Sequence, residues 1–422
     1  MFTSFSTALS ALNATSTAID VVGNNLANMN TPGYKTSAVA FHDLVTQSLG
    51  AGLGQTPVVF GTGRPTTIRE FTQGAIQTTS GLLDGAIQGD GFFVVGDSNG
   101  NTLYTRAGNF QVDKNGVLMT DTGQKVQGWT TFDPATGTVD TNGPVDNIVV
   151  PVGSLDPPTV TTQFTVDLNL NSNAAADTTS DFSTPMMVYD SLGNSHVLTL
   201  NFEKTGANQW NYSASLPGQD VSGGTAGTPF PISGASGSLT FDSSGNLTSP
   251  AAGSPIALSI TGLTDGAADM NLTWDPYTSA GAGRITQFAQ KSAQSASSQN
   301  GAPAAQLVHV SMADGGGVVA QYSNGHQVVV GQVALASIRN AGSLLAVGNN
   351  NYQLSALTAN PSIGVPGTGG RGLILGGSIE SSTVDIATEF TNLITYQRSY
   401  EANGKVVTTA DQLSQDTINL IR

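Results

Sequence analysis

The side chains that most often carry acid–base or metal chemistry are few and scattered in this sequence. Its four histidines are His42, His196, His309 and His326. They show neither the spacing of metal ligands nor a serine and an acid nearby in a triad-like motif. We therefore expect structural or surface roles for all four. Cysteine is absent, which excludes disulfides, thiolate nucleophiles and cysteine-bound metals.

Two further patterns begin like ligand-binding loops without completing them. The Asp-x-Asn-Gly turns at residues 97–100 and 113–116 start like a calcium loop but lack its later glutamate. Hairpin turns are the expected structure of these segments. The glycine-rich residues 367–372 lack the Lys-Ser/Thr pair of a phosphate loop. The sequence therefore predicts no enzyme, no cofactor and no metal site.

The overall charge is sparse and acidic. Charged residues make up 10% of the chain, against about 25% in an average soluble protein, and the net charge is −15. A nucleic-acid partner is excluded, because it requires a basic surface. No run of about 18 apolar residues is present that would predict membrane insertion. A polar but weakly charged surface favours broad subunit contacts, since few ions must be desolvated.

The N-terminal segment does not look like a secretory signal peptide. Its first basic residue is Lys35, and no long apolar core precedes a cleavage site. We expect either a cytosolic protein or export by a route that reads uncleaved polar ends. The pattern of the two ends favours export.

These ends are the most regular parts of the sequence. Residues 1–30 contain no proline and a single charge, Asp20. Their alternating three-and-four spacing predicts an amphipathic helix with a coiled-coil-like seam of Phe2, Phe5, Leu9, Leu12, Ile19 and Leu26. Pro32 and Gly33 end this helix, since proline disfavours helix before it and glycine tolerates left-handed geometry.

A longer helix is expected at the opposite end. Ser382 and Asp385 predict a capping box, and no proline follows Pro366. The predicted seam consists of Phe390, Leu393, Tyr400, Val407, Ile418 and Ile421, beside a second apolar row that includes Leu413. This helix would span roughly forty residues, or about 60 Å.

Neither helix can bury its apolar side chains alone. The pair could pack as an ordinary hairpin on a globular core, or neighbouring copies of the chain could bury it. The middle of the sequence has almost no helical pattern and offers little to receive such a long pair. Burial between subunits is therefore the favoured interpretation.

The middle of the chain has an all-β pattern. Short strands such as residues 91–95, 197–202 and 327–330 alternate with Gly-containing turns between about 70 and 380. The predicted fold class is mainly β with α-helical coiled-coil termini, in a nested multidomain arrangement with two β domains. The expected domains are an inner coiled-coil polymerisation domain (1–30 and 378–422), an extended connector (31–70), a discontinuous middle β domain (71–155 and 301–377) and an outer inserted β domain (156–300).

Both ends also carry recognisable signatures. Residues 24–35, Asn-Asn-Leu-Ala-Asn-Met-Asn-Thr-Pro-Gly-Tyr-Lys, resemble the N-terminal signature of the flagellar rod and hook axial proteins. Residues 382–385, 389–391 and 397–409 resemble the C-terminal signature of that family. The signature positions expected to take part in self-assembly are Asn24, Asn25, Asn28 and Gln397.

Within this family, some segments are more selective than others. Residues 89–95 and 104–110 are similar to the first β domain of rod and hook members alike. Residues 190–196, 331–335 and 347–352 are similar to hook-type members. The resemblance covers nearly the whole chain and is weakest at about 205–285.

The resemblance implies a structural subunit of the bacterial flagellum, exported without a cleaved signal peptide by the flagellar type III export apparatus. It would polymerise into the short curved tube that joins rod to filament, transmitting motor torque as a universal joint. The implied partners are further copies of the chain, the distal rod protein, the hook cap and the hook–filament junction proteins.

Two alternatives stay open. A distal rod subunit belongs to the same family but has no comparable insert. A secreted β-rich adhesin or carbohydrate-active enzyme would place aromatic side chains around a cleft, whereas Trp129, Trp210 and Trp274 are dispersed.

Overall fold

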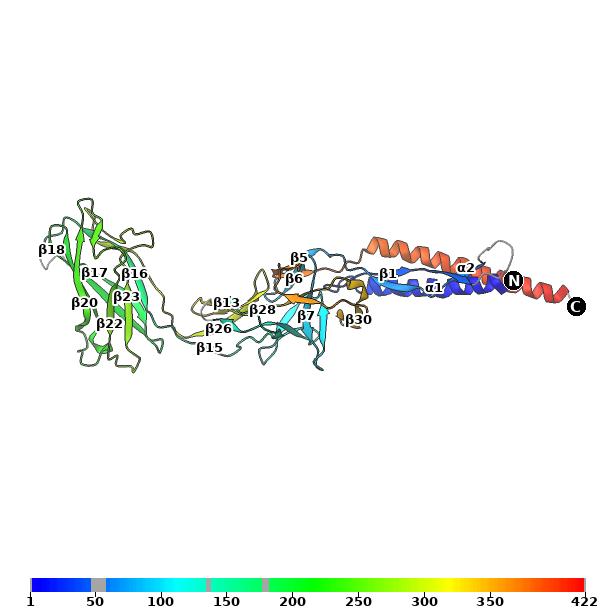
Figure 1. The fold of residues 1–422 in the computed structure, drawn as a ribbon, viewed down its shortest axis with the longest axis horizontal. Helices are drawn as coiled ribbons and strands as arrows, with labels where there is room; N and C mark the ends of the chain where they lie inside the picture. Colours follow the sequence, from blue (N-terminus) through cyan, green and yellow to red (C-terminus); the bar gives the residue numbers. More distant parts are fainter. Residues whose placement is uncertain (1, 47–57, 134–137, 177–181, 421–422) are drawn as a thin grey trace. The chain divides into compact units, whose positions relative to one another are not determined.

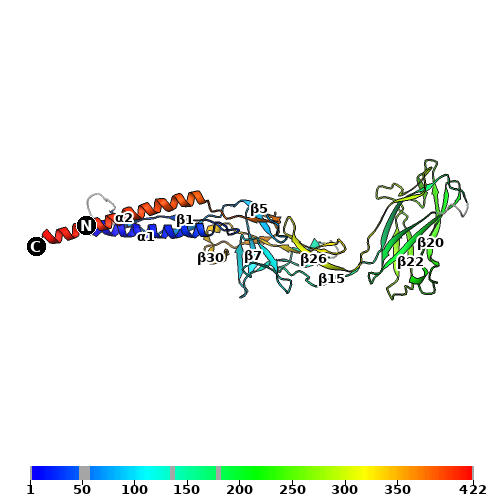
Figure 2. The ribbon, with the colours of Figure 1, turned by 180° about the vertical axis from the view of Figure 1, so that it is seen from behind.

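Two α-helices from the two ends of the chain lie side by side (Figure 1). The computed structural model describes residues 2–46, 58–133, 138–176 and 182–420, with α1 at Phe2–Ala27 and α2 at Ile386–Leu420. The helices are antiparallel, and they remain adjacent when seen from behind in Figure 2. With 35 residues, α2 is about 52 Å long, which is shorter than predicted.

The buried side chains of α1 are mostly small. Ala8, Ala14, Ala18 and Val22 are at most 3% exposed, and their spacing places them on one face of the helix. This helix contacts α2 and strands β1 and β3. Small residues permit a close approach of the backbones. Of the predicted seam of larger side chains, Leu12, Ile19 and Leu26 are partly buried, whereas Phe5 and Leu9 are exposed.

The segment between α1 and the first β domain folds back along α1. Strand β1 (Ser37–Ala40) pairs with β4 (Thr66–Arg69), and β2 (Asp43–Thr46) pairs with β3 (Val58–Thr62), both antiparallel. Gly61 in β3 has φ +82°, and a Cβ there would lie 2.3 Å from Ser10 Oγ. Glycine therefore allows this strand pair to lie directly on the helix.

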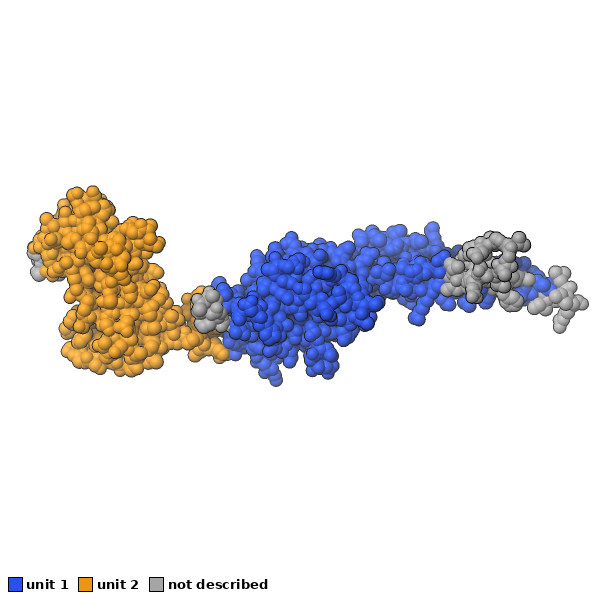
Figure 3. Space-filling model, viewed as in Figure 1, with its two compact units in different colours: residues 1–152, 309–321, 327–422 blue, residues 153–308, 322–326 orange. Residues whose placement is uncertain are grey.

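The described residues form two compact units, coloured separately in Figure 3. Unit 1 comprises residues 1–152, 309–321 and 327–422, and unit 2 comprises residues 153–308 and 322–326. In sequence, unit 2 therefore lies between two parts of unit 1.

The β part of unit 1 is built around an extended sheet. Neighbouring strands within it follow the order β27-β28-β11-β7-β8-β31-β30. Its core contains Phe92, Val94, Tyr104, Trp129 and Tyr352. The strands are β5 (Ile76–Thr78), β6 (Gly85–Gln88), β7 (Phe92–Gly96), β8 (Thr102–Thr105), β9 (Phe110–Val112), β10 (Leu118–Thr120), β11 (Lys125–Trp129), β12 (Phe132–Asp133), β13 (Thr138–Val139), β14 (Asp146–Asn147), β27 (Gly317–Tyr322), β28 (Gln327–Val333), β29 (Leu335–Ser337), β30 (Leu345–Gly348), β31 (Asn351–Gln353), β32 (Ser362–Gly364), β33 (Leu373–Gly376) and β34 (Ser378–Glu380).

Unit 2 contains two five-stranded sheets that share one hydrophobic core. One has the order β17-β18-β19-β20-β21, and in the other β22-β23-β16-β24 is joined by β25 on β16. Trp210 and Trp274 are fully buried in this core. The strands and the short 3-10 helix are β15 (Leu155–Asp156), β16 (Gln163–Asn171), β17 (Phe182–Tyr189), β18 (Ser195–Gly206), β19 (Gln209–Pro217), η1 (Gly218–Asp220), β20 (Pro229–Phe241), β21 (Leu247–Ser249), β22 (Ile256–Ile260), β23 (Met270–Trp274), β24 (Ile285–Phe288) and β25 (Ala293–Gln299), while β26 (Ala305–Met312) begins in this unit and ends in unit 1.

The predicted fold class is confirmed: the chain is mainly β, with one helix at each end. The three strands predicted at residues 91–95, 197–202 and 327–330 correspond to β7, β18 and β28. The Asp-Gly turns are hairpin turns, in which Asp97 and Asp113 accept hydrogen bonds from backbone N–H groups. Within the described residues, no helix combines the length and apolarity needed to cross a membrane.

Candidate functional site

Asn25, near the end of α1, hydrogen-bonds to two other segments of unit 1, β1 and α2. Its Nδ2 donates to the Ser37 carbonyl at 2.8 Å and to Glu389 Oε1 at 2.9 Å, and its Oδ1 accepts from the Ser37 N–H at 3.1 Å. Asn25 is 1% exposed. Every hydrogen bond described for this side chain lies inside the chain, where it positions α2 and β1 against α1. Its role in self-assembly stays a prediction.

Tyr34 hydrogen-bonds to the same end of α1. Its hydroxyl lies 2.9 Å from Asn24 Oδ1 and 3.1 Å from Asn25 Oδ1. Burial raises the pKa of this hydroxyl, so it keeps its proton and can donate. Asn28, whose Nδ2 donates to the Asn24 carbonyl at 2.9 Å, completes the polar end of α1.

The next residue along the chain, Lys35, belongs to a buried ion-pair triad. Lys35 Nζ is 2.6 Å from Glu380 Oε1, and Arg106 NH1 is 3.2 Å from Glu380 Oε2. The three side chains are 0–4% exposed. Glu380 also accepts the Gly74 N–H at 2.7 Å, and Lys35 donates to the Thr72 carbonyl. One carboxylate thus joins the N-terminal segment, β34 and the loop after β8.

Gly33 permits the close approach that this triad requires. Its φ is +68°, and a Cβ there would lie 2.5 Å from the backbone carbon of Arg106. Its N–H donates to the Glu380 carbonyl at 2.7 Å. The segment after α1 consequently runs directly beside β34, with Thr383 accepting the Thr36 N–H at 2.9 Å. We call Asn25, Tyr34, Lys35, Arg106, Glu380 and Glu389 the helix–sheet junction.

Helix α2 begins at the junction with a cap different from the predicted one. Asp385 Oδ1 accepts the Thr388 N–H at 2.7 Å, and this bonding lowers the pKa of Asp385. Ser382 Oγ accepts the Val384 N–H at 3.3 Å, outside the helix. The predicted capping box of Ser382 and Asp385 is therefore wrong: Asp385 is itself the N-cap, because the helix starts at Ile386.

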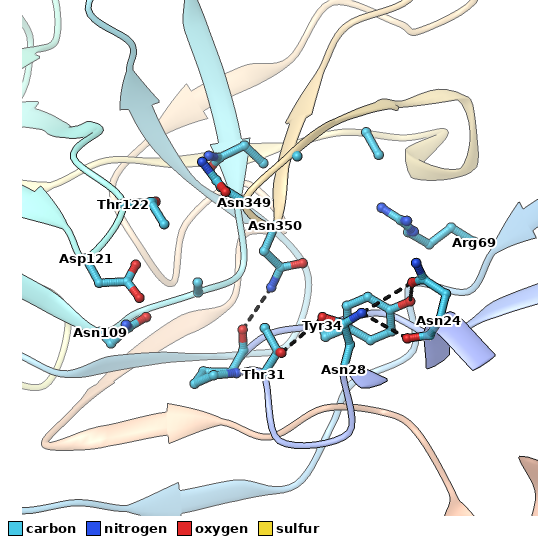
Figure 4. A pocket seen from close by; sticks show the side chains of 15 residues that line it. Asn24, Asn28, Thr31, Tyr34, Arg69, Asn109, Asp121, Thr122, Asn349 and Asn350 are labelled. Carbon is cyan, nitrogen blue, oxygen red and sulfur yellow. Dashed lines mark hydrogen bonds between the residues drawn. The ribbon is translucent and has the colours of Figure 1, made fainter. Parts of the chain in front are cut away.

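A hollow of about 500 Å³ lies next to the junction (Figure 4). Its described lining is mostly amide and hydroxyl groups, with one carboxyl, Asp121, one guanidinium, Arg69, and no histidine or lysine. Asn350 Nδ2 donates to the Pro32 carbonyl at 2.8 Å, which ties the strand β30–β31 turn to the end of α1. General acid–base chemistry needs a titratable pair in reach of a substrate, which this lining does not offer.

The large apolar side chains of both helices remain at the surface of unit 1. The exposed fraction is 41% for Phe5, 46% for Leu9, 51% for Phe390, 45% for Tyr400 and 53% for Leu413. The remaining predicted positions with described side chains are the partly buried Leu12, Ile19, Leu26, Leu393 and Val407 and the exposed Asn24 and Gln397. Phe2 and Ile418 lie in the helices without described side chains, and Ile421 lies outside the described residues.

Further apolar residues of α2 share this exposure. Ile386, Ile394 and Val406 are 46–50% exposed. At 100° per residue, Ile386, Phe390 and Ile394 form a first apolar patch, and Val406 and Leu413 form a second that points about 150° away. The second predicted row included Val406 and Leu413 but was placed beside the seam, and Ile386 and Ile394 were not predicted.

The junction residues Glu380, Arg106 and Lys35 were also missed as a group. They lie far apart in sequence. Their only common signal is that they are charged residues in a chain where only 10% of residues are charged. Of the histidines, His42 lies 3.0 Å from Thr66 Oγ1 and His326 lies 3.0 Å from Asp156 Oδ2. His196 is buried among three carboxylates, Asp190, Asp220 and Asp265.

Four family profiles match successive parts of the chain. They are described as Flagella basal body rod protein (residues 5–35), Flagellar hook protein FlgE/F/G D1 domain (86–169), Flagellar basal body protein FlaE D2 domain (159–302) and Flagellar basal body rod FlgEFG protein C-terminal (375–420). The first and last include the α1 and α2 sides of the helix–sheet junction.

Similarity to curated relatives extends over the full length. The flagellar hook protein FlgE of Escherichia coli (strain K12) is 33% identical, with 99% of each chain covered. That of Treponema pallidum (strain Nichols) is 32% identical, with 100% of each chain covered. The crystal structure of Helicobacter pylori flagellar hook protein FlgE2 shares the fold, with a TM-score of 0.50 at 16% identity over 71% of this chain and 99% of that one. The chain therefore belongs, along its entire length, to the flagellar hook protein FlgE family.

Proposed function

We propose that this chain is a structural subunit that polymerises into the curved tube of the flagellar hook and transmits torque between rod and filament. The observation that carries the proposal is the apolar surface of the two terminal helices. Eight large apolar side chains there are 41–53% exposed: Phe5, Leu9, Ile386, Phe390, Ile394, Tyr400, Val406 and Leu413. We call these residues the exposed helix surface.

Such a surface is unfavourable in an isolated subunit. Completing the burial of a half-exposed Leu, Ile or Phe contributes about 1 kcal/mol, so eight such residues supply a substantial driving force for association. The low charge of the chain helps, because few ions would lose water in the contact.

The two patches of α2 indicate how subunits would associate. Ile386, Phe390 and Ile394 face a direction about 150° from that of Val406 and Leu413. Two distinct patches on one helix fit two different neighbours rather than one symmetric partner. Heterologous contacts of this kind generate rings or open helical filaments, and a tube requires the open kind.

The domain roles follow from this proposal. Residues 1–30 and 378–422 would form the inner polymerisation domain, 31–70 the connector, 71–155 and 301–377 the middle β domain, and 156–300 the outer domain. Beyond further copies of the chain, we infer contacts with the distal rod protein, the hook cap, the hook–filament junction proteins and the type III export apparatus.

The proposal is tested by assembly of the purified chain. Sulfate strengthens apolar association, so polymers are induced with ammonium sulfate, pelleted and imaged by negative-stain electron microscopy. We expect tubes from the unmodified chain and none from Ile394→Ser or Leu413→Ser, with the helical circular dichroism at 222 nm unchanged. Leu357→Ser, which alters an 82% exposed leucine outside the helices, is the matched control and should assemble normally. Normal tubes from both helix variants would refute the proposal.

A further inference from the structure

His196 occupies an unusual position within unit 2. Its Nε2 lies 3.2 Å from Asp190 Oδ2 and 3.3 Å from Asp265 Oδ2, and its Nδ1 lies 3.1 Å from Asp220 Oδ2. The ring is 7% exposed, the Asp190 side chain is fully buried, and those of Asp220 and Asp265 are 21% and 25% exposed. A single imidazole therefore has carboxylate oxygens at both of its nitrogens.

This geometry requires an extra proton. A carboxylate only accepts hydrogen bonds, and a neutral imidazole has one N–H donor and one lone pair. A neutral ring would direct its lone pair at a carboxylate oxygen about 3 Å away, which is repulsive. An imidazolium donates from both nitrogens and offsets part of the negative charge of the three acids.

The four groups come from separate elements of unit 2. Asp190 and His196 flank the turn between β17 and β18, Asp220 ends η1 after β19, and Asp265 lies in the β22–β23 loop. Strands β17, β18 and β19 belong to one sheet, and β22 and β23 to the other. The imidazole thus connects the two sheets at one end of their shared core.

Neighbouring bonds show that the same elements meet there. The Thr264 N–H donates to the Asp220 carbonyl at 3.0 Å, and the Ala268 N–H donates to Ser191 Oγ at 3.0 Å. Asn194 Nδ2 bridges the carboxylates of Asp190 and Asp265 at 3.2 and 3.1 Å. These bonds bring the β22–β23 loop against both η1 and the β17–β18 turn, around the ring.

Other charged groups nearby do not replace the imidazolium. Asp269, in the β22–β23 loop, accepts the Gly262 N–H within its own loop. The basic side chains Lys204 and Arg284 are engaged elsewhere in the unit, by the Ser172 carbonyl and Asp167. Among the described residues, the ion-pair partner of Asp190, Asp220 and Asp265 is His196.

We propose that protonated His196 is a charged clasp that holds the two sheets of unit 2 together at this end, and that loss of its proton in alkaline medium opens the clasp. Burial alone would lower the pKa of His196, but Asp220, Asp190 and Asp265 raise it above its usual value. Burial likewise opposes ionisation of Asp190, yet the hydrogen bonds donated by Asn194 and His196 lower its pKa to about 2.

The direction of the pH dependence follows from these shifts. A histidine with a raised pKa contributes its full stabilisation below about pH 6.5, the unfolded value, and loses it as the pH rises through the folded value. The contribution of Asp190 is present above about pH 4 and is lost as the pH falls towards 2. Unit 2 should therefore be most stable between about pH 4 and 6.5, below the pH range in which the clasp opens.

The test follows unit 2 inside the full chain. Trp129→Phe removes the tryptophan of unit 1 and leaves Trp210 and Trp274, both fully buried in unit 2, as the fluorescent reporters. In this background, the urea midpoint should fall by about 0.5–1 M between pH 6 and pH 9.5. His196→Gln should lower the midpoint at pH 6 and abolish most of that fall.

His326→Gln is the matched control, because His326 also contacts an aspartate in unit 2 but its ring is 54% exposed. It should retain the pH dependence. If His196→Gln retains it too, the proposal is wrong. Should that variant fail to fold, ¹⁵N-histidine NMR of the unmodified chain decides, since both ring nitrogens of His196 should still be protonated at pH 6.5, where a free imidazole has lost half of its protons. A ring that is mostly neutral at pH 6.5, or a midpoint that rises with Zn²⁺ and falls with EDTA, would overturn the clasp.

Discussion

At the scale of single residues, the helix–sheet junction depends on one carboxylate. Glu380 accepts from Lys35, from Arg106 and from the Gly74 N–H, all inside the protein. Burial lowers the pKa of Lys35, although its hydrogen bond to Glu380 opposes that effect. Two buried cations thus share a single anion. The three positions should therefore differ in how much stability their substitution costs.

Removing the shared anion should destabilise unit 1 more than removing one cation. Glu380→Gln leaves two buried cations without a counter-charge and should cost about 3–5 kcal/mol. Lys35→Met should cost less, because Arg106 and Gly74 still cover the carboxylate. Urea unfolding followed at 222 nm measures both. Lys114→Met, at an exposed lysine, is the control and should be neutral. Equal losses for the two junction variants would contradict the shared-anion account.

Glu389 is a second junction carboxyl, and its two oxygens differ in their hydrogen bonding. It is 5% exposed, and Asn25 donates to its Oε1, while its Oε2 has no hydrogen-bond partner among the described residues. Burial raises the pKa of Glu389, and the charges of Asp385 and Glu70 add to this. A carboxyl with a raised pKa stabilises the fold most below its unfolded value, and that stability declines as the pH rises through the folded value.

Glu389→Gln should therefore remove a pH-dependent cost. The amide oxygen can still accept from Asn25, and an uncharged group is cheaper to bury than a carboxylate. Melting temperatures at 222 nm should be similar for variant and unmodified chain at pH 4, with the variant at least as stable at pH 7.5. Glu401→Gln, at an exposed position of α2, supplies the control. A variant that is clearly less stable at pH 7.5 would show that Glu389 is needed in its charged form.

At the scale of elements, the contact between the helices depends on small residues of α1. Ala18 is fully buried and Ala14 is 1% exposed. Ala18→Leu would add three carbon atoms to a packed contact and should cost about 1–3 kcal/mol, since overpacking displaces neighbours. Thermal unfolding at 222 nm reports the loss. Ser16→Leu adds a similar side chain at an exposed position of the same helix and should have little effect. A neutral Ala18→Leu would mean that the helices can separate freely.

The helices also show how far sequence reasoning reaches. Their existence and register follow from the spacing of Phe5, Leu9 and Phe390, because an apolar period near 3.6 residues is a local property. Whether that face meets its own chain or another is not local, and here the intrachain contact uses alanines that carry little apolar signal. The cap was misplaced for a related reason: Ser382 and Asp385 are both good cap residues, and β34, ending at Glu380, decides where the helix can begin.

The same limit applies to the charged clusters. Asp190 and His196 are six residues apart. Asp220 and Asp265 join them only because the two sheets of unit 2 pack against each other. The triad of Lys35, Arg106 and Glu380 likewise spans almost the whole sequence. Hairpin turns such as residues 97–100 were predictable because the aspartate, the glycine and their bonds are contained in a few residues.

At the scale of the whole molecule, the segments that enter and leave the body of unit 2 pair with each other at Thr159 and Ala302. The Thr159 N–H donates to the Ala302 carbonyl at 2.9 Å, and the Ala302 N–H donates to the Thr159 carbonyl at 2.8 Å. Residues that exchange both hydrogen bonds have Cα atoms about 5.5 Å apart, a span that a two-residue hairpin closes. The profile of the FlaE D2 domain begins and ends at these same residues.

Replacing residues 160–301 by Asn-Gly should therefore leave unit 1 folded, with an unchanged helical melt at 222 nm. If the exposed helix surface drives assembly, the shortened chain should still pellet in sulfate, because α1 and α2 are intact. Loss of the outer domain should alter the curvature of the tubes seen by electron microscopy. A matched excision of residues 165–296, which cuts inside β16 and β25, should instead yield insoluble protein. Failure of the 160–301 excision to assemble would place a necessary contact in unit 2, whereas curved tubes of normal shape would remove that unit from any role in bending.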